Sequence, residues 1–200
     1  MAEKKTAVLI YPGFCNFEIS TALEILALAE KPITVFAKKS GPVRSEEGLT
    51  ILPEQCIADA MFREYDSLLL PGAQDIRDAV EDAEILSFIR EFHNQKKIIG
   101  AISAAPVLLV KGGVMGKRPF MAGVNREDLY EEGFTKQELF RMQSWDDNLK
   151  NPVADGYLIS ENIITSVSYE FVRFGLAFAK MLGIAISPET FGIKDRKAEP

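Results

Sequence analysis

Ser103 stands at the point of the chain where an apolar run ends and a second apolar run begins. Residues 98–102 carry no polar side chain and are typical of a buried strand, whereas 104–110 are typical of a buried helix. A sharp turn from strand to helix presents one side chain at the carboxyl edge of a sheet, with the first helical amides facing it. The pattern therefore indicates Ser103 as a candidate nucleophile and the Ala104 amide as a candidate oxyanion donor.

Ser103 also has an alternative role that needs no chemistry. Serine is among the best helix N-caps, and Pro106 is tolerated in the first helical turn. Because Pro106 supplies no N–H, such a cap would depend mainly on the amide of Ala105. Three roles for Ser103 stay open: a helix cap, a ligand-binding hydroxyl and a nucleophile.

Two further segments follow the ends of predicted strands. Glu18 comes after a strand at 7–11, and Pro71-Gly72-Ala73 comes after a strand at 67–70. Since ligands bind beyond the carboxyl ends of parallel strands, these segments are predicted to share one sheet edge with Ser103. Acidic residues in a first helical turn and glycines in turns are also common in segments without any function. The positions of Glu18 and Gly72 alone therefore do not show that they belong to a functional site.

Three segments of the chain resemble the DJ-1/PfpI superfamily. Residues 101–106, Ala-Ile-Ser-Ala-Ala-Pro, resemble its reactive-cysteine turn, with serine in place of cysteine. Residues 11–18 resemble the segment whose acid contacts that cysteine, and Glu18 falls at the position of the acid. Residues 69–73 resemble its Leu-Pro-Gly-Gly loop, with alanine as the last residue.

The resemblance implies a fold, a site and an assembly. Residues 155–166 and the helix beginning at 168 are similar to the closing hairpin and final helix of the superfamily, so the likeness runs through about residues 6–183. It implies a homodimer and a site in which Glu18 contacts Ser103 while backbone amides at Gly72 and Ala73 help to form an oxyanion site.

Serine in place of cysteine changes the chemistry that is available. A thiol at a helix amino terminus can ionise near neutrality, whereas a serine hydroxyl needs a general base. His93 is the only histidine, and the strand between it and Ser103 would separate them by roughly 20 Å. A Ser-His-acid triad within one chain is therefore excluded, and Glu18 is the candidate base if burial raises its pKa.

Three functions remain open from these residues. The first is a DJ-1/PfpI-like protein that lacks cysteine chemistry and binds a small ligand or partner at the elbow pocket. The second is a small-molecule hydrolase, amidase or hydratase that uses Ser103 with Glu18. The third is a cysteine-to-serine variant of an active family enzyme, for which the resemblance implies oxidation-sensing, deglycase or glyoxalase-like, amidase or protease-type activities.

The remaining reactive side chains give weaker signals. Cys15 is either a relocated redox thiol or a small buried residue, and Cys56 is the only other cysteine. The segment 144–147, Ser-Trp-Asp-Asp, is either a set of groups at the pocket mouth or a solvated loop with one anchoring aromatic side chain. Two cysteines and one histidine form no metal-ligand pattern, so neither a metal site nor a cofactor is predicted.

Strands alternate with helices along the chain. Strands are predicted at 7–11, 32–36, 67–70 and 98–102, a strand pair within 41–52, and a hairpin from 156–159 and 163–166. Helices are predicted after a possible Asn16 cap, over 83–95, from the elbow to Gly112-Gly113, and over about 169–182. The pattern predicts an α/β flavodoxin-like three-layer sandwich with a mostly parallel sheet, as one domain over 6–190 with a solvated tail at 191–200.

Composition limits the partners and the compartment. The chain has 200 residues, 47% of them hydrophobic, which suits one compact domain. A net charge of -6 without a long Lys/Arg run argues against nucleic acid and anionic membrane surfaces as partners. Two cysteines and the lack of an apolar segment of export or membrane-spanning length predict a reducing, cytoplasmic location.

Overall fold

A seven-stranded sheet forms the centre of the computed structural model, which describes residues 4–193. The strand order is β10-β11-β7-β6-β1-β2-β5, and every neighbouring pair is parallel except β10 with β11. The strands are β1 (Lys5–Leu9), β2 (Ile33–Ala37), β5 (Gln55–Cys56), β6 (Tyr65–Leu70), β7 (Ile98–Ile102), β10 (Tyr157–Ser160) and β11 (Ile163–Ser166). The predicted mostly parallel sheet is confirmed.

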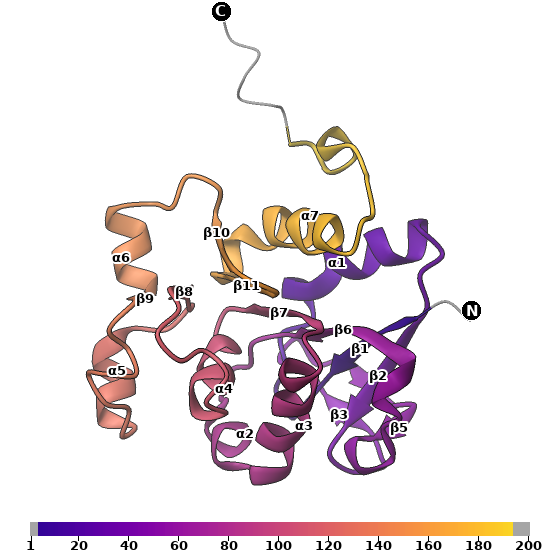
Figure 1. The fold of residues 1–200 in the computed structure, drawn as a ribbon, viewed down its shortest axis with the longest axis horizontal. Helices are drawn as coiled ribbons and strands as arrows, with labels where there is room; N and C mark the ends of the chain where they lie inside the picture. The colour runs from indigo at the N-terminus through magenta and orange to yellow at the C-terminus, as the bar shows by residue number, and fades with distance from the viewer. Residues whose placement is uncertain (1–3, 194–200) are drawn as a thin grey trace, which may run out of the picture.

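Helices cover both faces of this sheet (Figure 1). One face carries α1 (Phe17–Leu28) and α7 (Phe171–Met181), which pack on each other. The other face carries α2 (Arg77–Glu81), α3 (Ala83–Asn94) and α4 (Pro106–Lys111). The molecule is therefore the predicted flavodoxin-like α/β sandwich of three layers.

Two small sheets and two short helices complete the described chain. The predicted strand pair is β3 (Val43–Arg44) with β4 (Thr50–Ile51), an antiparallel pair outside the main sheet. A second pair, β8 (Phe120–Met121) and β9 (Met142–Gln143), is parallel. It lies with α5 (Arg126–Glu131) and α6 (Trp145–Lys150) to one side of the main sheet (Figure 1). Short 3-10 turns occur at Ile57–Asp59, Phe62–Glu64, Ser168–Glu170 and Pro188–Phe191.

The start of α1 differs from the prediction. Asn16 makes no side-chain cap hydrogen bond. The backbone N–H of Phe17 instead donates to Glu47 Oε1 at 3.0 Å, so a carboxylate from the turn between β3 and β4 satisfies this helix end. The predicted Asn16 cap is wrong because a partner distant in the sequence supplies the acceptor.

The core includes buried side chains of α1 and α7 on one face of the sheet and of α3 on the other, where an aromatic cluster lies. Phe36, Tyr65, Phe88 and Phe92 pack in edge-to-face or tilted ring contacts with centroids 5.2–6.2 Å apart. Such aromatic clusters bury large apolar areas and fix the distance between layers.

Most of the predicted tail at 191–200 lies outside the described residues, and the domain limits of 6–190 stay a prediction. Within residues 4–193, no helix is long and apolar enough to cross a membrane.

Candidate functional site

Ser103 lies directly after β7 in a left-handed backbone conformation, with φ of 60°. Its N–H donates to the carbonyl of Ser166 at 2.9 Å, and its carbonyl accepts from the N–H of Gly123 at 2.7 Å. Non-glycine residues seldom adopt this left-handed conformation, and it persists only where surrounding contacts hold the backbone. The end of β11 and the segment after β8 provide those restraints.

The structure excludes the hypothesis that Ser103 caps the following helix. The residue before the first turn of α4 is Ala105, whose backbone is already helical, and no side chain caps that helix end. Ser103 is two residues further back and outside the helix. The strand-to-helix elbow predicted from the sequence is thus present, and it presents the Ser103 side chain rather than using it as a cap.

Glu18 lies in the first turn of α1 and is only 2% exposed. Its Oε2 accepts a hydrogen bond from the Gly72 N–H at 2.7 Å. Burial raises the pKa of Glu18 to about 7, although hydrogen bonds from Ser103 and Gly72 pull the pKa the other way. Both protonation states of Glu18 are therefore accessible near neutrality, and its carboxyl group and the Ser103 side chain both lie against Gly72.

Gly72 is required by the close approach of these side chains. A Cβ at position 72 would lie 2.7 Å from Glu18 Oε2 and 2.7 Å from Ser103 Cβ. The Gly72 N–H, predicted to be an oxyanion donor, is already used by the Glu18 carboxyl group. Gly72 therefore positions Glu18 and leaves the oxyanion role to other amides.

Two amides beside Ser103 are unused. No hydrogen bond among residues 4–193 takes the backbone N–H of Ala73 or Ala104 as its donor. Both residues line a cavity of about 560 Å³ that also includes Gly123. A carbonyl or carboxylate oxygen of a small ligand is the acceptor that such paired amides bind.

The far wall of this elbow cavity comes from the segment around β8 and β9. Trp145 and Asn125 line it, and the Asn125 Oδ1 atom is buried without a hydrogen-bond partner among the described residues. The segment 144–147 is not the predicted loop, because Ser144 and Asp147 form a reciprocal capping box at the start of α6. Local sequence gave no signal for Gly123 and Asn125, since the β8–β9 pairing brings them to the site.

The cavity is also acidic. Its charged lining residues are Asp75, Arg77, Asp128 and Glu132, and Arg77 is paired with Asp75. The carboxylates of Asp128 and Glu132 make no ion pair within the described chain. A ligand with a neutral or cationic body therefore suits this wall better than an anion.

The remaining candidate groups lie apart from Ser103 or are unsuited to redox chemistry. His93 is near the carboxyl end of α3, which precedes the amino end of β7, so the predicted separation from Ser103 agrees with the topology. Cys15 is 5% exposed and its thiol donates to Glu46 Oε2 at 2.6 Å. Burial and this hydrogen bond raise the pKa of the Cys15 thiol, which opposes its predicted alternative role as a redox thiol.

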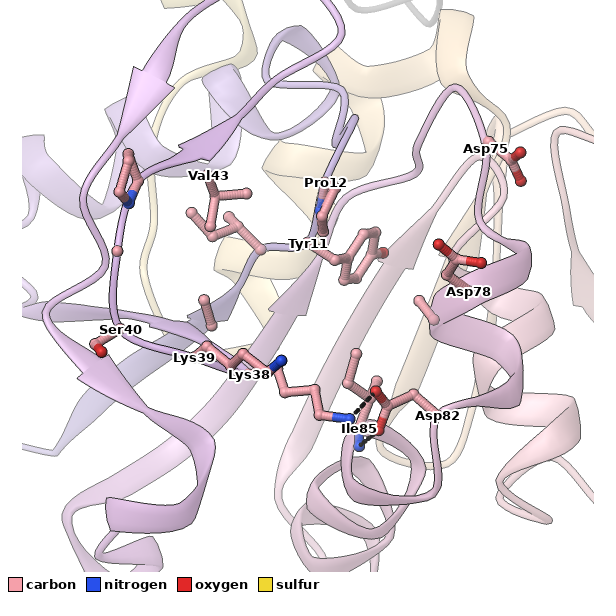
Figure 2. Close-up of a pocket in the computed structure, with 15 residues that line it drawn as sticks. Tyr11, Pro12, Lys38, Lys39, Ser40, Val43, Asp75, Asp78, Asp82 and Ile85 are labelled. Atoms are coloured by element: carbon pink, nitrogen blue, oxygen red, sulfur yellow. Dashed lines mark hydrogen bonds and ion pairs between the residues drawn. The ribbon is translucent and has the colours of Figure 1, made fainter.

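A larger cleft of about 670 Å³ lies at the same edge of the sheet (Figure 2). Tyr11 and Pro12 form its floor, and the Tyr11 hydroxyl donates to the Pro71 carbonyl. Figure 2 shows Lys38 extending across the cleft to Asp82, with which it forms an ion pair. This ion pair partly neutralises the opposite charges of the two walls. None of the predicted site residues lines this cleft.

Comparisons with known proteins agree with this architecture. The model of the DJ-1/PfpI family matches residues 4–181. The chain belongs to the DJ-1/PfpI family. It is 28% identical over 174 residues to Protein dj-1beta of Drosophila melanogaster, covering 84% of this chain and 85% of the relative. It is 23% identical over 168 residues to the glutathione-independent glyoxalase DJR-1.2 of Caenorhabditis elegans, covering 83% of this chain and 82% of the relative.

A solved structure shows the same fold within a longer chain. The two-domain protein of Anabaena variabilis, with DJ-1/ThiJ/PfpI-like and ferritin-like domains, is similar with a TM-score of 0.76 and 19% identity. The match covers 98% of this chain and 52% of that chain, so this DJ-1/PfpI family member spans about half the length of the two-domain protein.

Proposed function

We propose that this DJ-1/PfpI family member binds a small carbonyl compound in the elbow cavity, with Ser103 at the position of the family's reactive cysteine. The observation that carries the proposal is the pair of unused amides at Ala73 and Ala104 beside Ser103. Free N–H donors that line one partly enclosed cavity favour a carbonyl oxygen. Ser103 directly precedes Ala104 and is not itself a lining residue of the cavity, so a contact between its hydroxyl and the ligand is part of the proposal.

Binding is favoured over cysteine-type covalent chemistry because of the groups around Ser103. A serine hydroxyl is a far weaker acid than a thiol and becomes a nucleophile only when a base removes its proton. Glu18, with a pKa of about 7, is the titratable group beside Ser103, and the only imidazole of the chain, that of His93, lies on α3. The site therefore retains a pocket while lacking a thiolate.

Hydrolysis of a small ester or amide is the second candidate function. The left-handed conformation of Ser103, with φ of 60°, is the observation in its favour, since strain at a side chain presented on an elbow accompanies nucleophiles in hydrolases. In this mechanism Glu18 accepts the Ser103 proton, and the Ala73 and Ala104 amides stabilise the oxyanion. Activity on an activated ester that is lost in both Ser103→Ala and Glu18→Gln would favour it over binding alone.

Titration with glyoxal tests the binding proposal. The worm relative is named a glyoxalase, which makes glyoxal a reasonable first carbonyl probe. Trp145 is the only tryptophan and lines the cavity, so its fluorescence should change saturably as glyoxal binds, with no glycolate formed above the buffer rate. Ser103→Ala should weaken the response, whereas Ser87→Ala, an exposed serine on α3, should leave it unchanged.

Two results would contradict this proposal. An unsaturable fluorescence change that is equal in the wild type and Ser103→Ala would show that glyoxal reacts elsewhere. Rapid glycolate formation by the wild type would show that the cavity is catalytic without a cysteine at position 103.

We also propose a reducing, cytoplasmic location. Cys15 and Cys56 are both free, and neither takes part in a disulfide. Free thiols in a domain of this size are typical of reducing compartments. Fractionation of cells that express the tagged full chain would test this location.

A further inference from the structure

A third cavity, at the other end of the β8–β9 pair, has a charge opposite to that of the molecule. Because β8 and β9 run parallel, the segments that precede them meet at one end of the pair, where the Phe120 N–H donates to the Arg141 carbonyl at 3.3 Å. The hollow between these segments has a volume of about 560 Å³. The lining of this basic cavity includes Lys117, Arg118, Lys136, Glu138, Phe140 and Arg141.

Its charges are largely uncompensated. Lys117, Lys136 and Arg141 make no ion pair among the described residues, although the whole chain carries a net charge of -6. The single carboxylate of the lining, Glu138, accepts hydrogen bonds from the N–H and the hydroxyl of Thr135, each at 2.7 Å. A local positive field in an acidic protein concentrates small anions at this position.

Arg118 is held in place before any ligand arrives. Its Nη1 donates to the Val114 carbonyl at 3.0 Å, and its Nη2 donates to Glu161 Oε2 at 2.7 Å. The buried Nε of the same guanidinium has no partner among residues 4–193. A guanidinium fixed by its neighbours adds directed positive charge with little further loss of side-chain freedom.

Phe140 gives the cavity an aromatic wall. Phe140 is 79% exposed and lines the cavity together with Lys117, Lys136 and Arg141. An exposed ring offers a planar apolar surface that a second aromatic ring can cover by stacking. The volume lies in the range of pockets for small molecules.

We propose that the basic cavity binds a small aromatic phosphate, the chemistry of a mononucleotide. The phosphate lies among Lys117, Lys136 and Arg141, and the aromatic ring lies against Phe140. A longer nucleic acid is disfavoured because the charge of the molecule as a whole repels its extended phosphate backbone. This site is independent of the elbow cavity.

Calorimetric titration of the full chain with AMP tests the proposal. AMP should bind saturably and more tightly than either inorganic phosphate or adenosine, with weaker binding at higher salt. Lys136→Glu and Arg141→Glu should each weaken AMP binding by at least about tenfold, because each removes a charge-assisted contact. Phe140→Ala should weaken AMP binding and leave phosphate binding unchanged.

The controls separate this site from general charge effects and from the elbow. Lys150→Glu on α6 makes the same charge change at an exposed position outside the cavity and should leave AMP binding unchanged. Ser103→Ala should also leave it unchanged, whatever the outcome of the glyoxal titration. The proposal is overturned if AMP does not bind, if phosphate binds as tightly as AMP, or if a single-stranded oligonucleotide binds far more tightly than AMP.

Discussion

Glu18 is the residue whose protonation links the site to stability. Burial raises its pKa from an ordinary value near 4.5 to about 7. Between these pH values the folded protein holds a proton that the unfolded chain has released, so the free energy of unfolding falls as the pH rises. A pKa shift of this size contributes about 3 kcal/mol to the free energy of unfolding. This contribution is present in full below pH 4.5 and is lost as the pH passes 7.

The first prediction is that Glu18→Gln removes this pH dependence. The wild type should lose about 3 kcal/mol more than the variant between pH 4.5 and pH 8, as measured by urea unfolding at both pH values. Glu24→Gln is the matched control, because Glu24 is an exposed acid on the same helix. Equal losses in the wild type and Glu18→Gln would show that Glu18 does not carry the raised pKa.

Glu18, Gly72 and Ser103 lie together as predicted, whereas the hydrogen bonds around them were not predicted. The neighbourhood of Glu18, Gly72 and Ser103 followed from the parallel strand ends and the family resemblance. The use of the Gly72 N–H by Glu18, and the left-handed backbone of Ser103, depend on contacts with residues distant in the chain. No local pattern encodes those contacts.

At the scale of elements, a short helix positions the aromatic wall of the elbow cavity. Trp145 is the first residue of α6 and packs edge-to-face on Tyr169, with ring centroids 5.0 Å apart. The capping box of Ser144 and Asp147 fixes the start of this helix. A helix of six residues has few internal hydrogen bonds, so its cap contributes much of its order.

The second prediction concerns this cap. Ser144→Ala should lower the free energy of unfolding by about 1 kcal/mol and weaken the response of Trp145 fluorescence to glyoxal, because the indole loses its fixed position. Ser87→Ala, the exposed serine on α3, should change neither quantity. Unaltered stability and fluorescence in Ser144→Ala would show that packing on Tyr169 alone places Trp145.

The elements that sequence reasoning found are those with long apolar patterns. The helix predicted over 83–95 is observed as α3, and the elbow strand is observed with its predicted bounds as β7. The strands β8 and β9 have two residues each, which is too few for a hydrophobic periodicity to reveal them. They form through long-range pairing, which explains why one wall of the elbow cavity was missed.

At the scale of the whole molecule, the strand order of the sheet agrees with the family assignment, and the homodimer stays a prediction. The resemblance to the DJ-1/PfpI superfamily implies a homodimer with the same surface used on both subunits. Light scattering during size-exclusion chromatography at micromolar concentration should give a mass near 44 kDa, twice the 22.2 kDa of the chain. A mass near 22.2 kDa that persists across dilution would exclude the dimer.

The most direct test of the account is the reactivity of a thiol placed at the elbow by Ser103→Cys. The unused Ala104 amide favours a thiolate there, and a protonated Glu18 can donate a hydrogen bond to it, whereas an ionised Glu18 opposes it. Cys15 is buried and its pKa is raised, so it is a poor competitor.

Mild peroxide at pH 6.5, followed by peptide mass spectrometry, measures this reactivity. The thiol at position 103 should form sulfenic or sulfinic acid well before Cys15 or Cys56 is modified. A thiol at position 103 that titrates like a free cysteine and oxidises no faster than the two native cysteines would contradict the assignment of Ser103 to the reactive position.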